Sequence, residues 1–188
     1  MLEIELKAEV KNPDVVYDFL ARQGFRVQKY IVRDVYYAHP CRKFEETDEE
    51  LRVRREYKGK EEKLLITYKS LVEEGDRVVR EEIETIVHPE IIRIIERLGF
   101  RKALFKEKIG WYLSKDDLKI TLCRVKGGIG ERIVDLGYFI EVEILIDETE
   151  NIEEHRRRIE EFIRQIPGVG NIDLEYYTEK IERIIRSK

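Results

Sequence analysis

The fold is indicated first by residues 1–10, MLEIELKAEV, in which apolar and charged side chains alternate. Successive side chains of a β-strand point to opposite faces of the sheet, so residues i, i+2 and i+4 share a face. Glu3, Glu5 and Lys7 therefore lie on one face, and Leu2 and Ile4 lie on the other. The stretch predicts a strand with one apolar face and one face of ionised groups.

The same division returns in the strands predicted further along the chain. Charged residues share a face in each of them: Arg52 with Arg54, Arg80 with Glu82 and Glu84, Lys106 with Lys108, Glu141 with Glu143, and Lys69 at the end of the Leu65-Thr67-Lys69 row. For any single strand, the wet face of an ordinary antiparallel sheet explains such a row. A Glu-x-Glu row, however, places like charges about 7 Å apart on one face, where they repel unless a cation lies near. Together the rows favour an enclosed polar interior in which carboxylates bind a divalent metal and basic groups bind phosphate oxygens.

The order of the predicted elements favours a β-rich α+β fold. Strands are expected at about 1–10, 25–38, 51–57, 63–70, 77–87, 100–113, 118–125 and 138–146, and helices at 13–24, 89–99, about 151–165 and about 174–187. About eight antiparallel strands can close into a barrel, which removes the exposed sheet edges. We expect an eight-stranded antiparallel β-barrel with helices packed outside, the charged rows lining its interior, in a single domain over residues 1–188.

An internal repeat supports this arrangement. Residues 12–37 and 88–113 align so that Pro13 matches Pro89, Gly24-Phe25-Arg26 matches Gly99-Phe100-Arg101, and Tyr36-Tyr37 matches Trp111-Tyr112 with one gap. A strand–helix–long-strand unit used twice predicts two pseudo-symmetric halves of one sheet. Coincidence between two ordinary strand–helix units is the alternative.

Composition excludes several classes of protein. The 188 residues carry 36 Lys and Arg against 40 Asp and Glu, a net charge of −4, which argues against a generally basic nucleic-acid binder. No apolar run reaches the roughly 20 residues of a membrane-spanning helix, and no secretory signal precedes the first strand. We expect a cytoplasmic protein that binds neither nucleic acid nor membrane. Its abundant Glu, Lys, Arg and Ile are typical of proteins from hyperthermophiles.

The charged strands resemble those of a known family. Glu3-Ile4-Glu5-Leu6-Lys7 resembles the ExExK signature of the CYTH superfamily, also called triphosphate tunnel metalloenzymes. The resemblance continues in order through Arg33-Asp34-Val35-Tyr36-Tyr37, Leu51-Arg52-Val53-Arg54, Ile66-Thr67-Tyr68-Lys69, Arg80-Glu81-Glu82-Ile83-Glu84, Lys106-Glu107-Lys108 and Phe139-Ile140-Glu141-Val142-Glu143. It covers residues from about 1 to 180. The superfamily includes class IV adenylyl cyclases, thiamine triphosphatases and inorganic tripolyphosphatases.

The resemblance implies roles for individual residues in a tunnel that binds a triphosphate together with Mg²⁺ or Mn²⁺. The phosphate oxygens would be held by Lys7, Arg52, Arg54, Lys69, Lys106 and Lys108. The metal would be bound by Glu3, Glu5, Glu141 and Glu143, and further lining would come from Arg80, Glu82 and Glu84. In hydrolytic members a tyrosine and a lysine are thought to activate water, and Tyr36 or Tyr37 with Lys69 match those positions.

The sequence departs from the family pattern at two places. Cys123 stands where the family usually has an aspartate metal ligand, and a thiol suits Mg²⁺ poorly. Gly127–Gly137 is longer than the short glycine turn expected there; Asp135 within it is expected to be solvated rather than a substitute ligand. Aromatic residues that could stack on a base or a thiazolium ring, although core packing is the commoner role, are Trp111, Tyr112, Tyr176 and Tyr177.

The expected function is that of a metal-dependent enzyme similar to class IV adenylyl cyclases, which convert ATP to cyclic AMP and pyrophosphate. The first alternative is a tripolyphosphatase or thiamine triphosphatase that uses the same tunnel. The second is a non-catalytic polyphosphate or nucleotide binder, which the departure at Cys123 supports. In each case the expected partner is a small-molecule triphosphate, namely ATP, thiamine triphosphate or tripolyphosphate, and a homodimer is left open.

Overall fold

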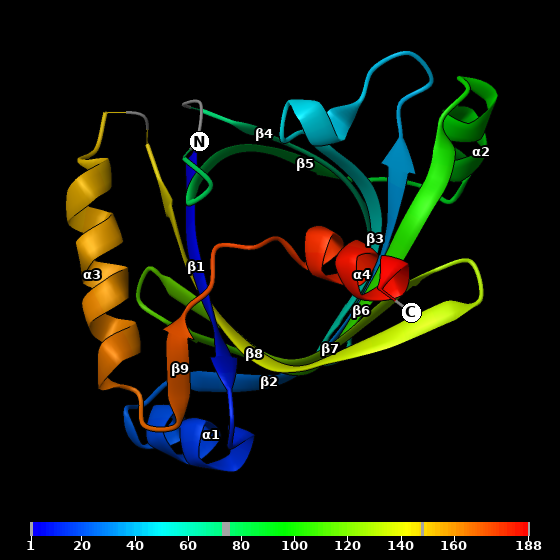
Figure 1. Cartoon of the computed structure of the whole chain (residues 1–188). Helices are drawn as coiled ribbons and strands as arrows, with labels where there is room; N and C mark the ends of the chain where they lie inside the picture. The colour runs from blue at the N-terminus through cyan, green and yellow to red at the C-terminus, as the bar shows by residue number, and fades with distance from the viewer. Residues whose placement is uncertain (1, 73–75, 148, 188) are drawn as a thin grey trace.

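A computed structural model describes residues 2–72, 76–147 and 149–187. Its barrel strands are β1 (Leu2–Val10), β2 (Arg26–Ala38), β3 (Glu50–Lys58), β4 (Glu61–Leu71), β5 (Val79–Ile86), β6 (Arg101–Lys115), β7 (Leu118–Ile129) and β8 (Arg132–Ile146). They pair in the order β5-β4-β3-β2-β6-β7-β8-β1, and β1 returns to β5 to close the barrel (Figure 1). The short β9 (Val169–Ile172) adds to the edge of β1. The predicted eight-stranded antiparallel barrel is confirmed.

The pairing order reflects the internal repeat. The units β1–α1–β2 and β5–α2–β6 have the same order of elements, with α1 at Pro13–Arg22 and α2 at Glu90–Arg97. Strand β1 pairs with β8 as β5 pairs with β4, and β2 meets β6 between the two halves. Gly24 and Gly99 follow the two helices with φ values of +81° and +94°, a conformation that glycine adopts without steric cost.

The main apolar core lies outside the barrel wall rather than inside it. Alternate residues of β1 and β8 turn outward and pack beneath α1 and α3 (Ile152–Gln165), which lie along the wall in Figure 1. Fully buried members of this core include Ile4, Leu20, Ile140, Val142 and Ile159. The hydrophobic core therefore holds the charged faces of the same strands inward, towards the barrel interior.

One end of the barrel is covered by α4 (Tyr177–Arg186), which packs against β6, β7 and β8 (Figure 1). Ile181 and Ile185 of this helix join an apolar cluster with Tyr36, Leu104 and Val134. The helix was expected to begin near residue 174 and begins at Tyr177.

The glycine-rich segment that was expected to be a loop is instead the tip of the β7–β8 hairpin. It turns at Gly130, where φ is +58°, and the register shifts between Val125 and Lys126. A Cβ atom on Gly127 would lie 2.2 Å from Cδ1 of Ile181, so this position needs glycine to let α4 approach the strand. Because these glycines are required for close packing, the segment lacks the alternation of apolar and polar side chains that would have identified a strand.

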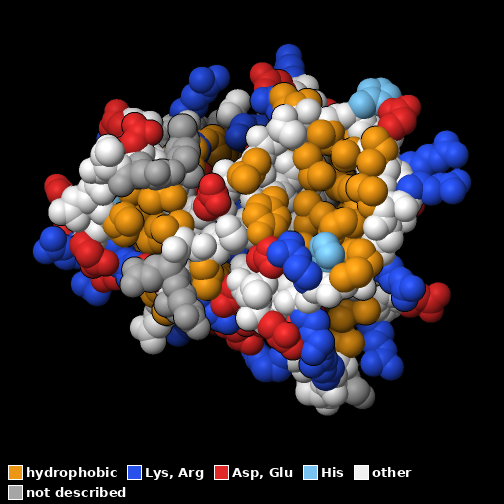
Figure 2. Space-filling model, turned by 90° about the horizontal axis from the view of Figure 1, so that it is seen from above, with side chains coloured by type: hydrophobic (Ala, Val, Ile, Leu, Met, Phe, Trp, Pro, Cys, Tyr) orange, Lys and Arg blue, Asp and Glu red, His pale blue; other side chains and the backbone are white. Residues whose placement is uncertain are grey.

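Apolar side chains also reach the surface. They gather in a patch on the face seen in Figure 2, among acidic and basic side chains. Ile83, Ile94 and Leu98 are among the exposed large apolar side chains of the protein. No helix in the described part of the chain combines the length and the apolarity needed to cross a membrane.

Candidate active site in the barrel

The barrel encloses a cavity of about 540 Å³ whose wall is mainly charged. All six basic residues predicted to hold phosphate line it: Lys7, Arg52, Arg54, Lys69, Lys106 and Lys108. So do the predicted acidic residues Glu3, Glu5, Glu82, Glu84, Glu141 and Glu143. Arg80 is buried beside the cavity, where its guanidinium pairs with Glu50 at 3.1 Å. The two-residue period of each strand thus brings the charged rows to one enclosed space.

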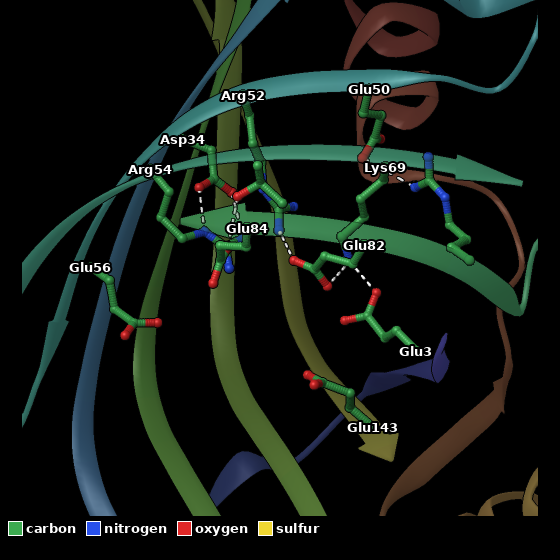
Figure 3. Close-up of polar contacts among 12 residues, drawn as sticks. Glu3, Asp34, Glu50, Arg52, Arg54, Glu56, Lys69, Glu82, Glu84 and Glu143 are labelled. Carbon is green, nitrogen blue, oxygen red and sulfur yellow. Dashed lines mark hydrogen bonds and ion pairs between the residues drawn. The ribbon is translucent and has the colours of Figure 1, made fainter. Parts of the chain in front are cut away.

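Lys69 lies between two carboxylates on neighbouring strands. Its ammonium pairs with Glu3 and with Glu82, the latter at 3.1 Å (Figure 3). Burial lowers the pKa of Lys69, but the charges of Glu3 and Glu82 outweigh burial and raise it above the usual value. For Glu82, burial is likewise outweighed by Lys69, and the pKa falls to about 2. The pair therefore stays ionised at neutral pH.

Asp34 organises the opposite wall. Arg54 donates from Nε to Asp34 Oδ1 at 2.7 Å and from Nη2 to Oδ2 at 3.0 Å (Figure 3). Lys106 Nζ lies 3.3 Å from the same Oδ2. The Asp34 side chain has no exposed surface. Burial would raise the pKa of Asp34, but Arg54 and Lys106 hold it well below the usual range. Lys106 also donates to the hydroxyl of Tyr36 at 2.6 Å.

Glu141 is held by cations rather than grouped with other carboxylates. Lys108 Nζ donates to its two oxygens at 2.6 and 2.5 Å, and the hydroxyl of Thr121 donates at 2.8 Å. Burial opposes ionisation, yet the charges of Lys108 and Lys106 keep the pKa of Glu141 well below its usual range. Among the residues predicted to bind metal, Glu141 is thus tied to the cationic wall.

The other three predicted metal ligands form an acidic cluster. Carboxylate oxygens of Glu3, Glu5 and Glu143 all lie within 4.8 Å of one another. Burial, reinforced by Glu143 and Glu5 and opposed by Lys69, raises the pKa of Glu3 well above its usual value. Two oxygens that bind one Mg²⁺ at about 2.0–2.1 Å lie at most about 4.2 Å apart. Oxygens within 4.8 Å of one another therefore reach a common ion after small side-chain rotations. The chemistry and spacing of this donor set fit a hard divalent cation.

Comparison with known proteins shows the family of this chain. The CYTH domain family model matches residues 1–171. The chain belongs to the CYTH domain family. CYTH proteins are metal-dependent, in agreement with the acidic cluster inside the barrel.

Two archaeal proteins and one plant protein illustrate the similarity. A putative adenylate cyclase of Methanocaldococcus jannaschii is 30% identical over 173 residues, covering 90% of each chain. The structure of the PH1819 protein from Pyrococcus horikoshii OT3 is 31% identical, with a TM-score of 0.80 and 99% of each chain covered. A putative adenylyl cyclase from Hippeastrum, described as having a dominant triphosphatase activity, shares the fold at 15% identity and a TM-score of 0.58, covering 99% of this chain and 95% of that one.

Within this CYTH barrel, the two candidate tyrosines of β2 lie on opposite sides of the wall. Tyr36 borders the cavity, whereas Tyr37 packs outside it with Val53 and Ile95, beneath α2. Successive residues of a strand point to opposite faces, so Tyr36 shares the inner face with Asp34 and Tyr37 points outward. The structure therefore brings Tyr36, but not Tyr37, to the site. Tyr36 contacts Lys106, while Lys69 pairs with Glu3 and Glu82.

Cys123 is on the inner face of β7, but neighbouring side chains cover it and it does not line the cavity. It packs against Tyr30 and Val32 in an apolar cluster, and only 1% of its surface is exposed. Burial raises the pKa of the thiol to about 12, so it remains protonated at neutral pH. A protonated, buried thiol is not a ligand for Mg²⁺, and the acidic cluster forms without it.

Several lining residues of the CYTH cavity were not predicted as site residues. Glu50 lies two positions before Arg52, and the buried Asp34, which pairs with the lining residue Arg54, lies two positions before Tyr36. The alternation rule applied to these two neighbouring positions would have found both. Thr121 and Lys119 share the inward face of β7 with Cys123 in the same way. Others come from the C-terminal segment, which carries no alternating signal: Asp173, Leu174 and Thr178. Tyr176 and Tyr177 of the same segment, which the sequence offered as stacking aromatics with core packing as the commoner role, also line the cavity.

Proposed function

We propose that this CYTH protein is a divalent-metal-dependent enzyme acting on a triphosphate, with conversion of ATP to cyclic AMP and pyrophosphate as its reaction, in a single domain over residues 1–188. One observation carries the proposal. A single enclosed cavity combines a wall of buried cations with a cluster of three carboxylates. A triphosphate with its metal ion needs both kinds of group within a few ångströms of each other.

The cationic wall supports binding of the phosphate chain. Arg52 and Lys106 are only 5% and 4% exposed, and Arg54 is held in place by Asp34. The Nε of Arg52 has no hydrogen-bond partner among the described residues, so this donor is available to a phosphate oxygen. Charge-assisted hydrogen bonds are strong in such a water-poor enclosure, and their geometry is fixed before the ligand arrives.

The acidic cluster supports binding of the metal. Glu3, Glu5 and Glu143 are the residues that would hold Mg²⁺ or Mn²⁺. When bound, the ion supplies Lewis-acid stabilisation of charge on the phosphate oxygens and helps to activate the attacking hydroxyl. In the cyclase reaction the ribose 3′-oxygen bonds to the α-phosphorus as its proton is released to water, and the bond to the departing pyrophosphate breaks. The lysines and arginines of the wall stabilise the negative charge that gathers on the pyrophosphate.

An aromatic pair supports a nucleoside rather than a bare phosphate chain as the organic end of the substrate. Tyr30 and Tyr112 line the cavity with ring centroids 5.8 Å apart, and Lys58 Nζ lies 3.8 Å from the centre of the Tyr112 ring. Aromatic faces of this kind stack on nucleobases. The M. jannaschii relative that bears the name putative adenylate cyclase agrees with this choice.

Hydrolysis at the terminal phosphorus is the second candidate, and the contact between Lys106 and Tyr36 favours it. The hydroxyl of Tyr36 accepts a hydrogen bond from the Lys106 ammonium at 2.6 Å inside the cavity. An ammonium next to a phenol lowers the cost of forming phenolate, although burial raises the pKa of Tyr36 overall. Such a pair is placed to orient a water molecule for attack on the terminal phosphorus.

The reaction is tested by its products. The purified protein is incubated with ATP, thiamine triphosphate or tripolyphosphate, in the presence of Mg²⁺ or Mn²⁺. Cyclic AMP with pyrophosphate supports the proposal. Orthophosphate release supports the triphosphatase, and tight binding without turnover indicates a non-catalytic binder.

Two substitutions test the site itself, each with an exposed residue of the same type as its control. Glu5→Gln and Arg54→Ala should each lower turnover by at least about tenfold, because each removes a charge that contacts the metal or the phosphate. Glu81→Gln and Arg55→Ala change exposed residues of β5 and β3 and should retain activity. Near-normal turnover in both cavity variants would refute the site assignment.

A further inference from the structure

The first residue of α4 lies against the cationic wall of the cavity. Tyr177 is only 6% exposed, and its ring centre lies 5.4 Å from Lys7 Nζ, 5.1 Å from Lys106 Nζ and 5.3 Å from Lys108 Nζ. These three lysines come from β1 and β6, two strands that do not pair with each other. Tyr177 therefore marks the point where the phosphate-binding cations of both strands converge.

The hydroxyl of Tyr177 has no hydrogen-bond partner among the described residues, although the side chain borders the cavity. Buried hydroxyl groups in folded proteins nearly always have a partner. Packing against Val125 and against Phe139, whose ring lies 5.0 Å away and nearly perpendicular, explains why an aromatic ring is present. It does not explain the hydroxyl, because phenylalanine would fill the same space.

The hydroxyl is also suited to donate rather than accept. Burial and the negative charge of Glu141 raise the pKa of Tyr177 well above its usual value, so the phenol keeps its proton at neutral pH. The Glu141 carboxylate faces this phenol and its proximity contributes to the raised pKa of Tyr177, but the two groups do not meet in ordinary hydrogen-bond geometry. Glu141 already accepts hydrogen bonds from Lys108 and Thr121. Phosphate oxygens accept hydrogen bonds, and a lysine ammonium only donates them. A ligand oxygen drawn to the three ammonium groups is therefore a suitable acceptor for this phenol.

The helix that carries Tyr177 is anchored at its first turn. Arg77 forms two hydrogen bonds of 2.8 Å with the carboxylate of Glu179, and this same carboxylate accepts a bond from the backbone N–H of Tyr176 at 3.0 Å. Lys180 pairs with Asp173 at 3.0 Å. These contacts hold the tyrosine in one place, as a pre-organised substrate contact requires.

We propose that Tyr177 is a substrate-contacting residue whose hydroxyl donates a hydrogen bond to a phosphate oxygen held by Lys7, Lys106 and Lys108. This inference rests on the proposed function as a triphosphate enzyme and concerns a residue beyond the span of the family match, which ends at residue 171. The C-terminal helix then completes the binding site that the barrel strands begin.

The test compares two tyrosine-to-phenylalanine variants of the full-length protein by calorimetric titration with tripolyphosphate in the presence of Mg²⁺. Tyr177→Phe should weaken binding by about 10- to 100-fold, the usual effect of losing a hydrogen bond to a charged group. Its melting temperature without ligand should match that of the wild-type protein, since the ring and its packing remain. Tyr17→Phe removes a hydroxyl from a tyrosine that packs on Trp111 away from the cavity, and its affinity should be unchanged.

Three outcomes are distinguishable. Weaker binding by Tyr177→Phe at an unchanged melting temperature supports the proposal. Affinity within twofold of wild type, while Arg54→Ala still loses binding, overturns the role of Tyr177 and leaves the proposed function standing. Absence of tripolyphosphate binding by the wild-type protein overturns both.

A crystal of the wild-type protein soaked with tripolyphosphate gives a readout that does not depend on the stability of any variant. A phosphate oxygen about 2.5–3.0 Å from the Tyr177 hydroxyl supports the contact. A bound triphosphate with no oxygen within hydrogen-bonding reach of that hydroxyl overturns it.

Discussion

Replacing Asp34 by asparagine tests whether this buried carboxylate supports the cationic wall. The substitution keeps the shape but removes the charge that faces Arg54 and Lys106. Breaking a buried ion pair by removing one partner costs about 3–5 kcal/mol, because the remaining charge is left uncompensated. The carbonyl of the introduced amide can still accept one hydrogen bond, so we expect the lower end, about 3 kcal/mol. For a protein of this size that corresponds to a fall in melting temperature of about 6–12 °C.

Thermal unfolding monitored by circular dichroism measures this effect with and without tripolyphosphate. Because the ligand supplies the missing negative charge, we expect it to raise the melting temperature of Asp34→Asn more than that of the wild-type protein. The matched control is Asp135→Asn, which breaks the 2.6 Å pair with Arg124 on the exposed outer face and should change stability little. A melting temperature for Asp34→Asn within about 2 °C of wild type would refute the reasoning.

Two further predictions concern the same cavity. If hydrolysis is the reaction, Tyr36→Phe should lower orthophosphate release while Tyr37→Phe retains it, because only Tyr36 borders the cavity; equal effects of both changes in a phosphate-release assay would contradict this placement. For Glu82, the folded-state pKa of about 2 lies below the unfolded value of about 4.3, so its contribution to stability is complete above about pH 5 and is lost as the pH falls through 2. Urea midpoints measured from pH 7 to pH 3 should therefore fall less steeply in Glu82→Gln than in wild type, and parallel curves would count against the ion pair with Lys69.

The charged lining could be predicted from local sequence because it depends on a short-range rule. Glu3, Glu5 and Lys7 point the same way in any strand, whatever pairs with it. The apolar core on the other face fixes which face of the strand turns outward. A shift of the strand register by one residue would move the charged side chains into that core and Ile4 out of it. The same logic holds for Arg52 and for its neighbours on β3.

Which charged groups meet each other could not be predicted in this way. Glu143 joins Glu3 and Glu5 while Glu141 pairs with Lys108, although both glutamates belong to the same inward row of β8. That division depends on the stagger between strands in the closed barrel, which sets the height at which each side chain enters the cavity.

The alternation of apolar and ionised residues by itself determined that each strand has one apolar face, which packs outside the barrel, and one charged face, which lines its interior. Successive side chains of a strand point to opposite faces in any surroundings. The same alternation puts Tyr36 on the inner face with Asp34 and Tyr37 on the outer face, whereas only the tertiary structure decided that Tyr36 meets Lys106, because that contact depends on how β2 pairs with β6. It also decided that the C-terminal segment enters the site: Lys7 donates to the backbone oxygen of Asp173, 166 positions away along the chain. No local sequence pattern predicts a contact between residues so far apart in the chain, because it forms only when the whole chain closes and packs.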